Sequence, residues 1–193
     1  MNLNTYALTN PETGNTDNYV DFRSYSDGVW FGDPCYVVPD GHSHEKNYWE
    51  PLIDMMYEKK KFTHTDGKEY DQHVETFDSR NTIRVVEVDD EKFYMWSTAY
   101  GDGCYPITLN DRVVDKLGVD AGCLSVVPVK LLNLWDIGPT EAKQSGFISE
   151  GPGLHGFMAV EEGDFRWNNW DILTGPNAYE DEYGDEEEEG YYC

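Results

Sequence analysis

Short β-prone runs separated by turn residues recur along this 193-residue chain, and they constrain its fold more than any other feature. Branched and aromatic side chains favour strands because they pack well on a pleated surface. The clearest pair is 82–88 and 92–97, which Asp89, Asp90 and Glu91 join as a predicted hairpin. Aromatic residues make up 15% of the chain, so it can build a core despite its charge.

Further strands follow the same pattern. Pro34 has no N–H to donate, so it disfavours one continuous strand through 29–38. Residues 131–135 would form a short helical turn or a sheet edge. The remaining strand candidates are 29–31, 35–38, 104–109, 112–114 and 123–129, with a second hairpin formed by 157–160 and 165–173 around 161–164.

One segment, 47–60, has helical periodicity. Its apolar residues fall at i, i+3, i+4 and i+7, and they are Trp49, Leu52, Ile53 and Met56. Pro51 fits only in the first turn, and the lysines at 59–61 would close the helix, where its dipole favours cations. The expected fold class is therefore α+β: a mainly antiparallel β-sheet or sandwich with one amphipathic helix packed on it.

The composition changes at Gly175. Between 180 and 189 the chain is almost entirely acidic, and such a run repels itself and cannot bury a core. We therefore expect one β-rich domain over 1–174 and a disordered acidic tail over 175–193. The tail has candidate binding residues that would dock on a basic partner, or else it only aids solubility: Glu186, Glu187, Glu188, Glu189, Tyr191 and Tyr192.

Charge restricts the partners. The chain has 38 acidic and 14 basic side chains, a net charge of −24, and such a surface repels nucleic acid and anionic membranes. It would attract a basic protein or metal cations, or serve solubility alone. No apolar run reaches the roughly 18 residues of a membrane helix, and residues 1–20 do not resemble a signal peptide, which points to the cytoplasm. Free thiols are expected there, with the first three cysteines acting as small buried hydrophobes.

A near-repeat is the most unusual local feature. Residues 32–36 read Gly-Asp-Pro-Cys-Tyr, residues 101–105 read Gly-Asp-Gly-Cys-Tyr, and Asp-Ala-Gly-Cys follows at 120–123. Each reads as a tight turn that leads into a strand, in which Asp closes the turn and Gly permits positive φ. The first two segments would mark two related halves of a β-structure, or else all three are independent turns.

The same segments offer catalytic candidates. Asp33, Asp102 and Asp120 would converge at loop ends and act in acid–base catalysis or bind a divalent cation. Cys35 or Cys104 would serve as a nucleophile with a histidine. Turn-forming aspartates and buried cysteines are the simpler interpretation, since no established catalytic signature occurs.

Metals and cofactors have little support. His42 and His44 lie near Cys35 in sequence, but the paired cysteine spacings of a zinc site are absent, as is a calcium-binding loop. We expect no metal and no cofactor. Trp167 and Trp170 would form an exposed binding surface or pack in the core.

Segments 32–36, 98–105 and 119–122 resemble those of uncharacterised bacteriophage and bacterial proteins. That family has Gly-Asp-Pro-Cys-Tyr, then Tyr-Gly-Asp-Gly-x-Tyr, then Val-Asp-Ala-Gly before an apolar strand, and the resemblance spans about residues 29–130. It transfers no catalytic residues, but it implies a phage context in which small acidic proteins bind host machinery.

These observations favour a non-enzymatic binding protein, phage-encoded and cytoplasmic, that acts on a basic host or viral protein. It would be a nucleic-acid mimic or an inhibitor of host defence. One alternative is a small hydrolase or nucleotide-handling enzyme that uses the loop carboxylates. Another is a virion or assembly component.

Overall fold

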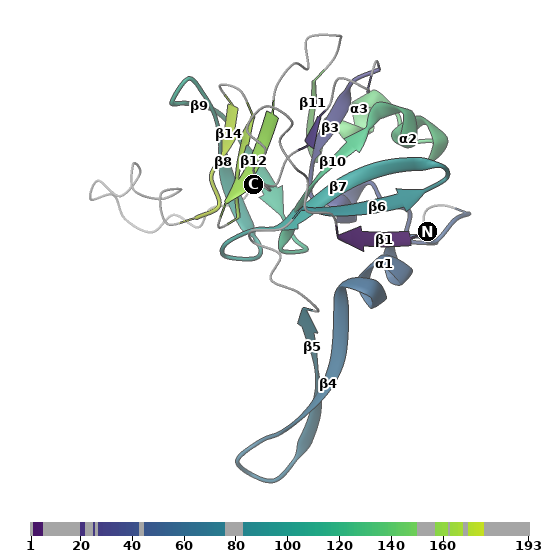
Figure 1. Cartoon of the computed structure of the whole chain (residues 1–193), viewed down its shortest axis with the longest axis vertical. Coiled ribbons are helices and arrows are strands. Elements are labelled where there is room, and N and C mark those ends of the chain that lie inside the picture. Colours follow the sequence, from purple (N-terminus) through teal and green to yellow (C-terminus); the bar gives the residue numbers. More distant parts are fainter. Residues whose placement is uncertain are drawn as a thin grey trace.

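The computed structural model describes residues 2–5, 20–21, 25, 27–42, 45–75, 83–149, 157–161, 163–167 and 170–175. Two six-stranded antiparallel sheets face each other, and a separate two-stranded hairpin projects away from them (Figure 1). A layer of short helices covers the outer face of one sheet. The predicted fold class, mainly antiparallel β with helix packed on it, is confirmed.

The first sheet, called sheet A, is buried on both faces in its centre. Every residue of its strands β3 and β10 is buried, which explains why these segments read as continuous apolar runs and not as an alternating pattern. In spatial order its strands are β1 (Asn2–Thr5), β6 (Arg84–Val88), β7 (Glu91–Ser97), β10 (Cys123–Pro128), β3 (Val29–Gly32) and β11 (Gly146–Ser149).

The second sheet, sheet B, packs on the inner face of sheet A. Aromatic side chains fill the space between them: the rings of Trp96 and Phe165 stack at 4.7 Å, and those of Phe31 and Trp167 at 5.4 Å. Its strands in order are β2 (Val20–Asp21), β12 (Phe157–Glu161), β13 (Asp164–Trp167), β14 (Trp170–Ile172), β8 (Gly103–Leu109) and β9 (Arg112–Val119).

A second core lies on the outer face of sheet A. There Trp30, Phe93 and Met95 point away from sheet B and pack under the helical layer. That layer consists of the 3₁₀ helix η2 (Pro34–Tyr36) and the helices α1 (Trp49–Met56), α2 (Val129–Leu134) and α3 (Pro139–Ala142). The break at Pro34 is confirmed, but the strand expected at 35–38 is wrong, because the chain enters η2 at Pro34 and continues as a turn. Of the two alternatives for 131–135, the helical turn is the one that forms, as the end of α2.

The helix predicted for 47–60 ends early. α1 stops at Met56, and the chain continues at once as β4 (Tyr57–Thr63), which pairs with β5 (Glu69–Glu75). The apolar stripe that predicted the helix ends at Met56, so nothing anchors a further helical turn to the core. The expectation that the lysines at 59–61 close the helix was wrong, because they lie in a strand.

Two other boundaries differ from the prediction. The strand expected at 112–114 runs to Val119, and the one expected over 165–173 is divided into β13 and β14. The hairpin between β6 and β7 is confirmed, with Asp89 and Asp90 alone in the turn, both at positive φ (51° and 62°). Such two-residue turns match the twist of the strands that they join.

Candidate functional site

The three near-repeat segments meet at one end of the sandwich. Gly32 at the end of β3 pairs with Ser125 of β10, and Cys123 at the start of β10 pairs with Ser97 at the end of β7. The loops that follow β3 and β7 and the loop that precedes β10 therefore lie together. The sequence analysis expected this convergence for the catalytic alternative.

Asp33 is the centre of this loop cluster. Its carboxylate is buried and accepts three backbone N–H bonds: from Cys35 at 2.9 Å and from Asp120 and Ala121 at 2.7 Å each. Burial raises the pKa of Asp33, and the three hydrogen bonds oppose that rise. The carboxylate thus closes the turn into η2 and fixes the 120–122 loop.

Backbone carbonyls join the other two loops. The Thr98 hydroxyl donates to the carbonyl oxygens of Gly101, at 2.6 Å, and Gly122, at 3.2 Å. The Tyr105 hydroxyl also donates to the Gly101 carbonyl, at 2.8 Å. Both glycines adopt positive φ (81° and 62°), as the turn interpretation requires.

The other two candidate carboxylates are exposed. Asp120 accepts a hydrogen bond from the Tyr36 hydroxyl at 2.6 Å, and this bond raises the pKa of Tyr36. Asp102 lies at the surface beside Gly122. Asp33, Asp102 and Asp120 thus share one end of the fold, but the buried carboxylate faces backbone donors and not the other two. Among the described residues, no group of three His, Cys, Asp or Glu side chains could hold a metal ion.

The cysteines do not resemble activated nucleophiles. Burial, and then the charge of Asp33, raise the pKa of the half-buried Cys35 thiol, so little thiolate forms at neutral pH. Cys123 is a free thiol buried in the outer core, as expected. Cys104 is disulfide-bonded, so the prediction of a free thiol is wrong there. Cys193 lies outside the described residues.

The near-repeat does not correspond to repeated structure. Cys35 and Tyr36 lie in η2, with Tyr36 exposed, whereas Cys104 and Tyr105 lie in β8, with Tyr105 fully buried between the sheets. Gly32 is also not needed for positive φ, because it lies within strand β3 and the indole of Trp30 occupies the space that a Cβ would take. A turn that leads into a strand describes the second and third segments only.

The tryptophans are placed by packing. Trp167 is 4% exposed between the sheets, as the core alternative describes, so its ring is not available to a partner. Trp170 is half-buried and stacks on Phe147 at 5.8 Å. The tail candidates Glu186, Glu187, Glu188, Glu189, Tyr191 and Tyr192 lie outside the described residues.

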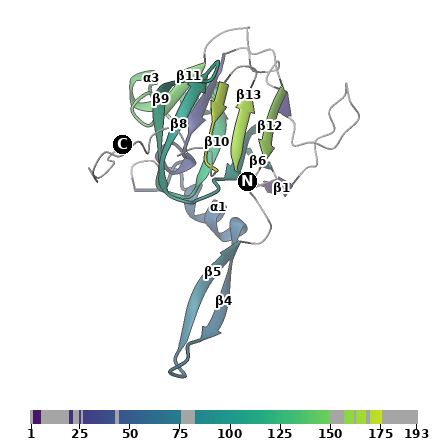
Figure 2. The same cartoon turned by 90° about the vertical axis from the view of Figure 1, so that its left-hand side faces the viewer.

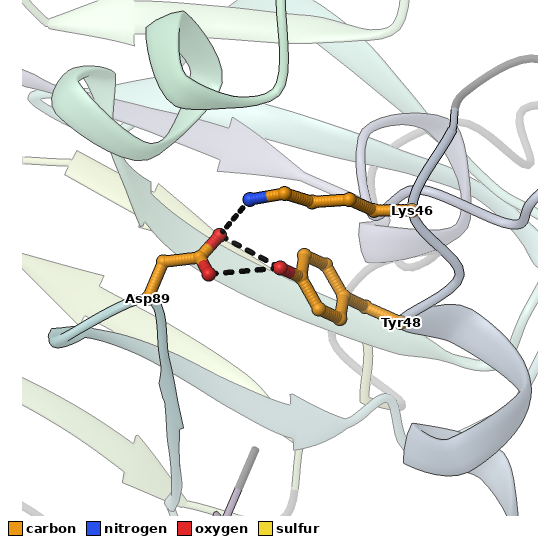
Figure 3. A network of polar contacts seen from close by, with 3 residues as sticks. All are labelled: Lys46, Tyr48 and Asp89. Atoms are coloured by element: carbon orange, nitrogen blue, oxygen red, sulfur yellow. Dashed lines mark hydrogen bonds and ion pairs between the residues drawn. The ribbon is translucent and has the colours of Figure 1, made fainter.

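A polar clamp that the sequence analysis missed lies at the other side of the helical layer (Figure 3). Asp89 in the β6–β7 turn accepts a hydrogen bond from Lys46 Nζ at 2.9 Å and from the Tyr48 hydroxyl at 2.8 Å. The hydrogen bond from Lys46 is the main cause of a lowered pKa of Asp89, and the bond from Tyr48 lowers it further. Tyr48 precedes α1 and its ring packs against Trp135, so the clamp ties the start of α1 to the body. Asp89 is 43 residues from Lys46 and 41 from Tyr48 in sequence, and no local pattern signals the contact.

Two surface cavities accompany these features. One, of about 320 Å³, lies between β9 and the α3–β11 connection and is lined by Tyr36, Lys116 and Phe147, among others. The other, of about 450 Å³, lies beside the β6–β7 turn and is lined by Tyr25, Tyr94 and Asp90, among others. Neither is lined by Asp33, Asp102 or Asp120, so the carboxylates considered for catalysis do not face either cavity.

Comparison of the chain with protein-family models, curated sequences and solved structures finds no match. The description of the fold and of the loop cluster therefore depends on this chain's own sequence and structure alone. In the part of the chain that the structure describes, no helix has the length and apolar character needed to cross a membrane.

Proposed function

We propose that this chain is a non-enzymatic acidic binding protein that acts on a basic host or viral protein. The observation that carries this proposal is the excess of exposed carboxylates over basic side chains on the described surface. Seven basic side chains are already held in ion pairs within the chain, and these are Lys46, Lys60, Lys61, Lys68, Lys92, Lys130 and Arg166.

A set of exposed carboxylates is left over. Each makes no ion pair with a described lysine or arginine, and they are Glu45, Asp54, Asp90, Asp102, Asp111, Asp136 and Glu141. Their charge is not neutralised within the described part of the chain, so it remains available to steer and hold a cationic partner. A nucleic-acid-binding protein is the natural target, because its basic surface is built to meet phosphates.

The phage resemblance suggests a setting for this activity: a phage-encoded protein that inhibits host defence or mimics nucleic acid in the host cytoplasm. Free Cys35 and Cys123 agree with a reducing compartment. The disulfide of Cys104 is the feature that would not persist there.

The enzymatic alternative has weaker support. A general base needs a carboxylate that can reach substrate, but all three hydrogen bonds that Asp33 accepts come from the backbone. A cysteine nucleophile needs a lowered pKa, and that of Cys35 is raised. The loop cluster is therefore better explained as the structural connection between the two sheets.

Three carboxylates suit a test of the proposal. Asp90, Asp111 and Asp136 are exposed and adopt positive φ of 60° to 62°, a region that Asn also tolerates. The triple variant D90N/D111N/D136N thus removes three charges while the turns keep their conformation. A charge-matched control is E58Q/D66N/E69Q, which neutralises three carboxylates already paired with lysines of the β4–β5 hairpin.

The experiment is affinity purification from a bacterial lysate with the wild-type chain and both variants as bait. A retained basic protein is then purified and its affinity measured with DNA as competitor. We expect the body variant to bind at least about tenfold more weakly, the control to bind like wild type, and DNA to compete. Equal binding by the body variant, or retention of no basic protein at about 0.1 M salt, contradicts the proposal.

A further inference from the structure

We infer that the β4–β5 hairpin, residues 57–75 and here called the arm, is the surface through which two copies of this chain associate. The inference goes beyond the proposed function, which concerns the binding of a basic partner by carboxylates on the body. It rests on four features of the arm: its isolation, its fixed base, its exposed aromatic pair and its charge.

The arm stands apart from both sheets (Figures 1 and 2). Among the described strands, β4 and β5 pair only with each other, over seven residues each, and every described side chain from Glu58 to Gln72 is exposed. A two-stranded hairpin with no further support is marginally stable in water. Contact with another surface would supply burial that the described part of the chain does not provide.

The base of the arm is fixed. Leu52 and Met56 of α1 are fully buried in the outer core, and β4 begins at the next residue, with no loop between helix and strand. The clamp of Lys46 and Tyr48 on Asp89 holds the start of the same helix (Figure 3). The arm is thus presented in a defined direction, which lowers the entropy lost on association.

The outer half of the arm has an apolar anchor. Phe62 and Tyr70 lie directly opposite each other in the hairpin, and their rings stack at 6.0 Å. They are 36% and 48% exposed, so both offer a face to a partner. Exposed paired aromatics are typical of contact surfaces and not of a solvated turn.

Charge favours a second copy as the partner. The arm has four lysines (Lys59, Lys60, Lys61 and Lys68) and five carboxylates, so its net charge is −1 in a chain of net charge −24, and three of the lysines lie in β4 with one glutamate. The ion pairs that Lys60, Lys61 and Lys68 form within the arm are exposed (Lys60 with Glu58 at 3.1 Å, for example), so they are weak and exchangeable. Two acidic bodies repel each other, and the lysine-rich strand is where one copy meets the carboxylates of the other most favourably.

A two-fold arrangement would use the arms of both copies. Each copy has one arm and one acidic body, so each arm can contact the other copy and no arm is left over. One arm from each copy approaches the size of one side of a standard interface, about 20–30 residues. We therefore expect a dimer and not an open chain of copies.

The test is sedimentation velocity on the full chain across about 1–200 μM, a range that covers weak and tight dimers. The first variant is F62S/Y70S, and its control is V113S/V114S, a pair of similarly exposed apolar residues on β9 (56% and 51%). The second is K59Q/K60Q/K61Q, and its charge-matched control is R112Q/K116Q/K143Q on the body. Circular dichroism verifies that each variant is folded.

We expect a dimer for wild type and both controls, and a dissociation constant at least about tenfold weaker for both arm variants. A wild-type monomer throughout the range overturns the inference, as does a dimer that survives both arm variants. Loss of the dimer in V113S/V114S alone would assign the interface to the β9 edge instead. The arm variants keep every carboxylate of the body, so they retain binding of a basic partner if the proposed function is correct.

Discussion

The carboxylate of Asp33 accepts the backbone N–H of Asp120, 87 residues further along the chain, at 2.7 Å. The same oxygen accepts the Ala121 N–H, also at 2.7 Å. This single side chain thus connects the end of β3, in sheet A, to the loop between β9 of sheet B and β10 of sheet A. Asp33 and Asp120 are both catalytic candidates by sequence, but in the structure the carboxylate of Asp33 holds the backbone of Asp120.

Asp33→Asn is therefore expected to destabilise the fold without any effect specific to binding. The amide has only one acceptor oxygen, and its NH₂ group would face at least one of the backbone donors that the carboxylate now satisfies. We expect a loss of about 1–3 kcal/mol in the free energy of unfolding, measured by urea denaturation. Asp102→Asn, at an exposed carboxylate of the same loop cluster, should stay within about 0.5 kcal/mol of wild type. Similar losses for the two variants would contradict the structural role of Asp33.

Asp89→Asn tests the clamp at the base of the arm. Asn tolerates the positive φ of 51° at this position, so the change removes the charge and leaves the turn. We expect a loss of about 1 kcal/mol at neutral pH, because the bonds from Lys46 and Tyr48 are weakened in a partly exposed site. Asp90→Asn is the control, since Asp90 shares the turn and the positive φ but forms no ion pair with a described basic residue.

The pH dependence of this difference has a definite sign. The pKa of Asp89 is lowered in the folded state, so its contribution is complete above the unfolded pKa and is lost as the pH falls through the folded one. The difference between wild type and Asp89→Asn should thus begin to shrink as the pH falls below about 3.9, the ordinary pKa of aspartate, and it should disappear below the lowered folded pKa. A constant difference between pH 7 and pH 3 would show that the charge of Asp89 is not what stabilises the clamp.

The sequence predicted those elements whose signals are local. The β6–β7 hairpin has two β-prone runs beside two aspartates, and the stripe from Trp49 to Met56 has helical spacing. The early end of α1 was missed because Tyr57–Thr63 is rich in lysines, which suit a helix terminus as well as an exposed strand. The burial of β3 on both faces depends on its place in sheet A. That place is a matter of strand order, which is set by contacts across the whole chain.

The candidate site shows the same limit. The three near-repeat segments lie together, as the catalytic alternative required, yet their similarity in sequence does not reflect similarity in structure. Tyr36 and Tyr105 occupy matching places in the motif but differ completely in burial, because one follows Pro34 into a 3₁₀ helix and the other enters a strand. The direction in which each side chain points follows from the element that it joins, and the motif does not specify that element.

Cys35 offers a direct test of the enzymatic alternative. Burial and the nearby charge of Asp33 raise the pKa of its thiol, so we expect alkylation by iodoacetamide at pH 7 to be at least about tenfold slower than that of a free cysteine. The rate at this residue is followed by peptide mass spectrometry, and urea-unfolded protein serves as the control in which Cys35 reacts normally. Fast, selective labelling of Cys35 in the folded chain would revive the case for a nucleophile.

Gly146 explains why the first near-repeat segment begins with a glycine at position 32, which the turn interpretation does not explain. It pairs with Gly32 across β11 and β3, and the Trp30 indole lies against both while its N–H donates to the Ala142 carbonyl at 2.7 Å. A Cβ at Gly146 would overlap the Phe31 carbonyl oxygen and the indole ring. Because the obstacle includes backbone, Gly146→Ala should cost at least about 3 kcal/mol of unfolding free energy. Gly138→Ala, at a position with open space around the new methyl, should cost less than about 1 kcal/mol. Comparable urea midpoints for the two variants would mean that β11 can move away from β3, and that the two glycines are not required for Trp30 to lie where it does.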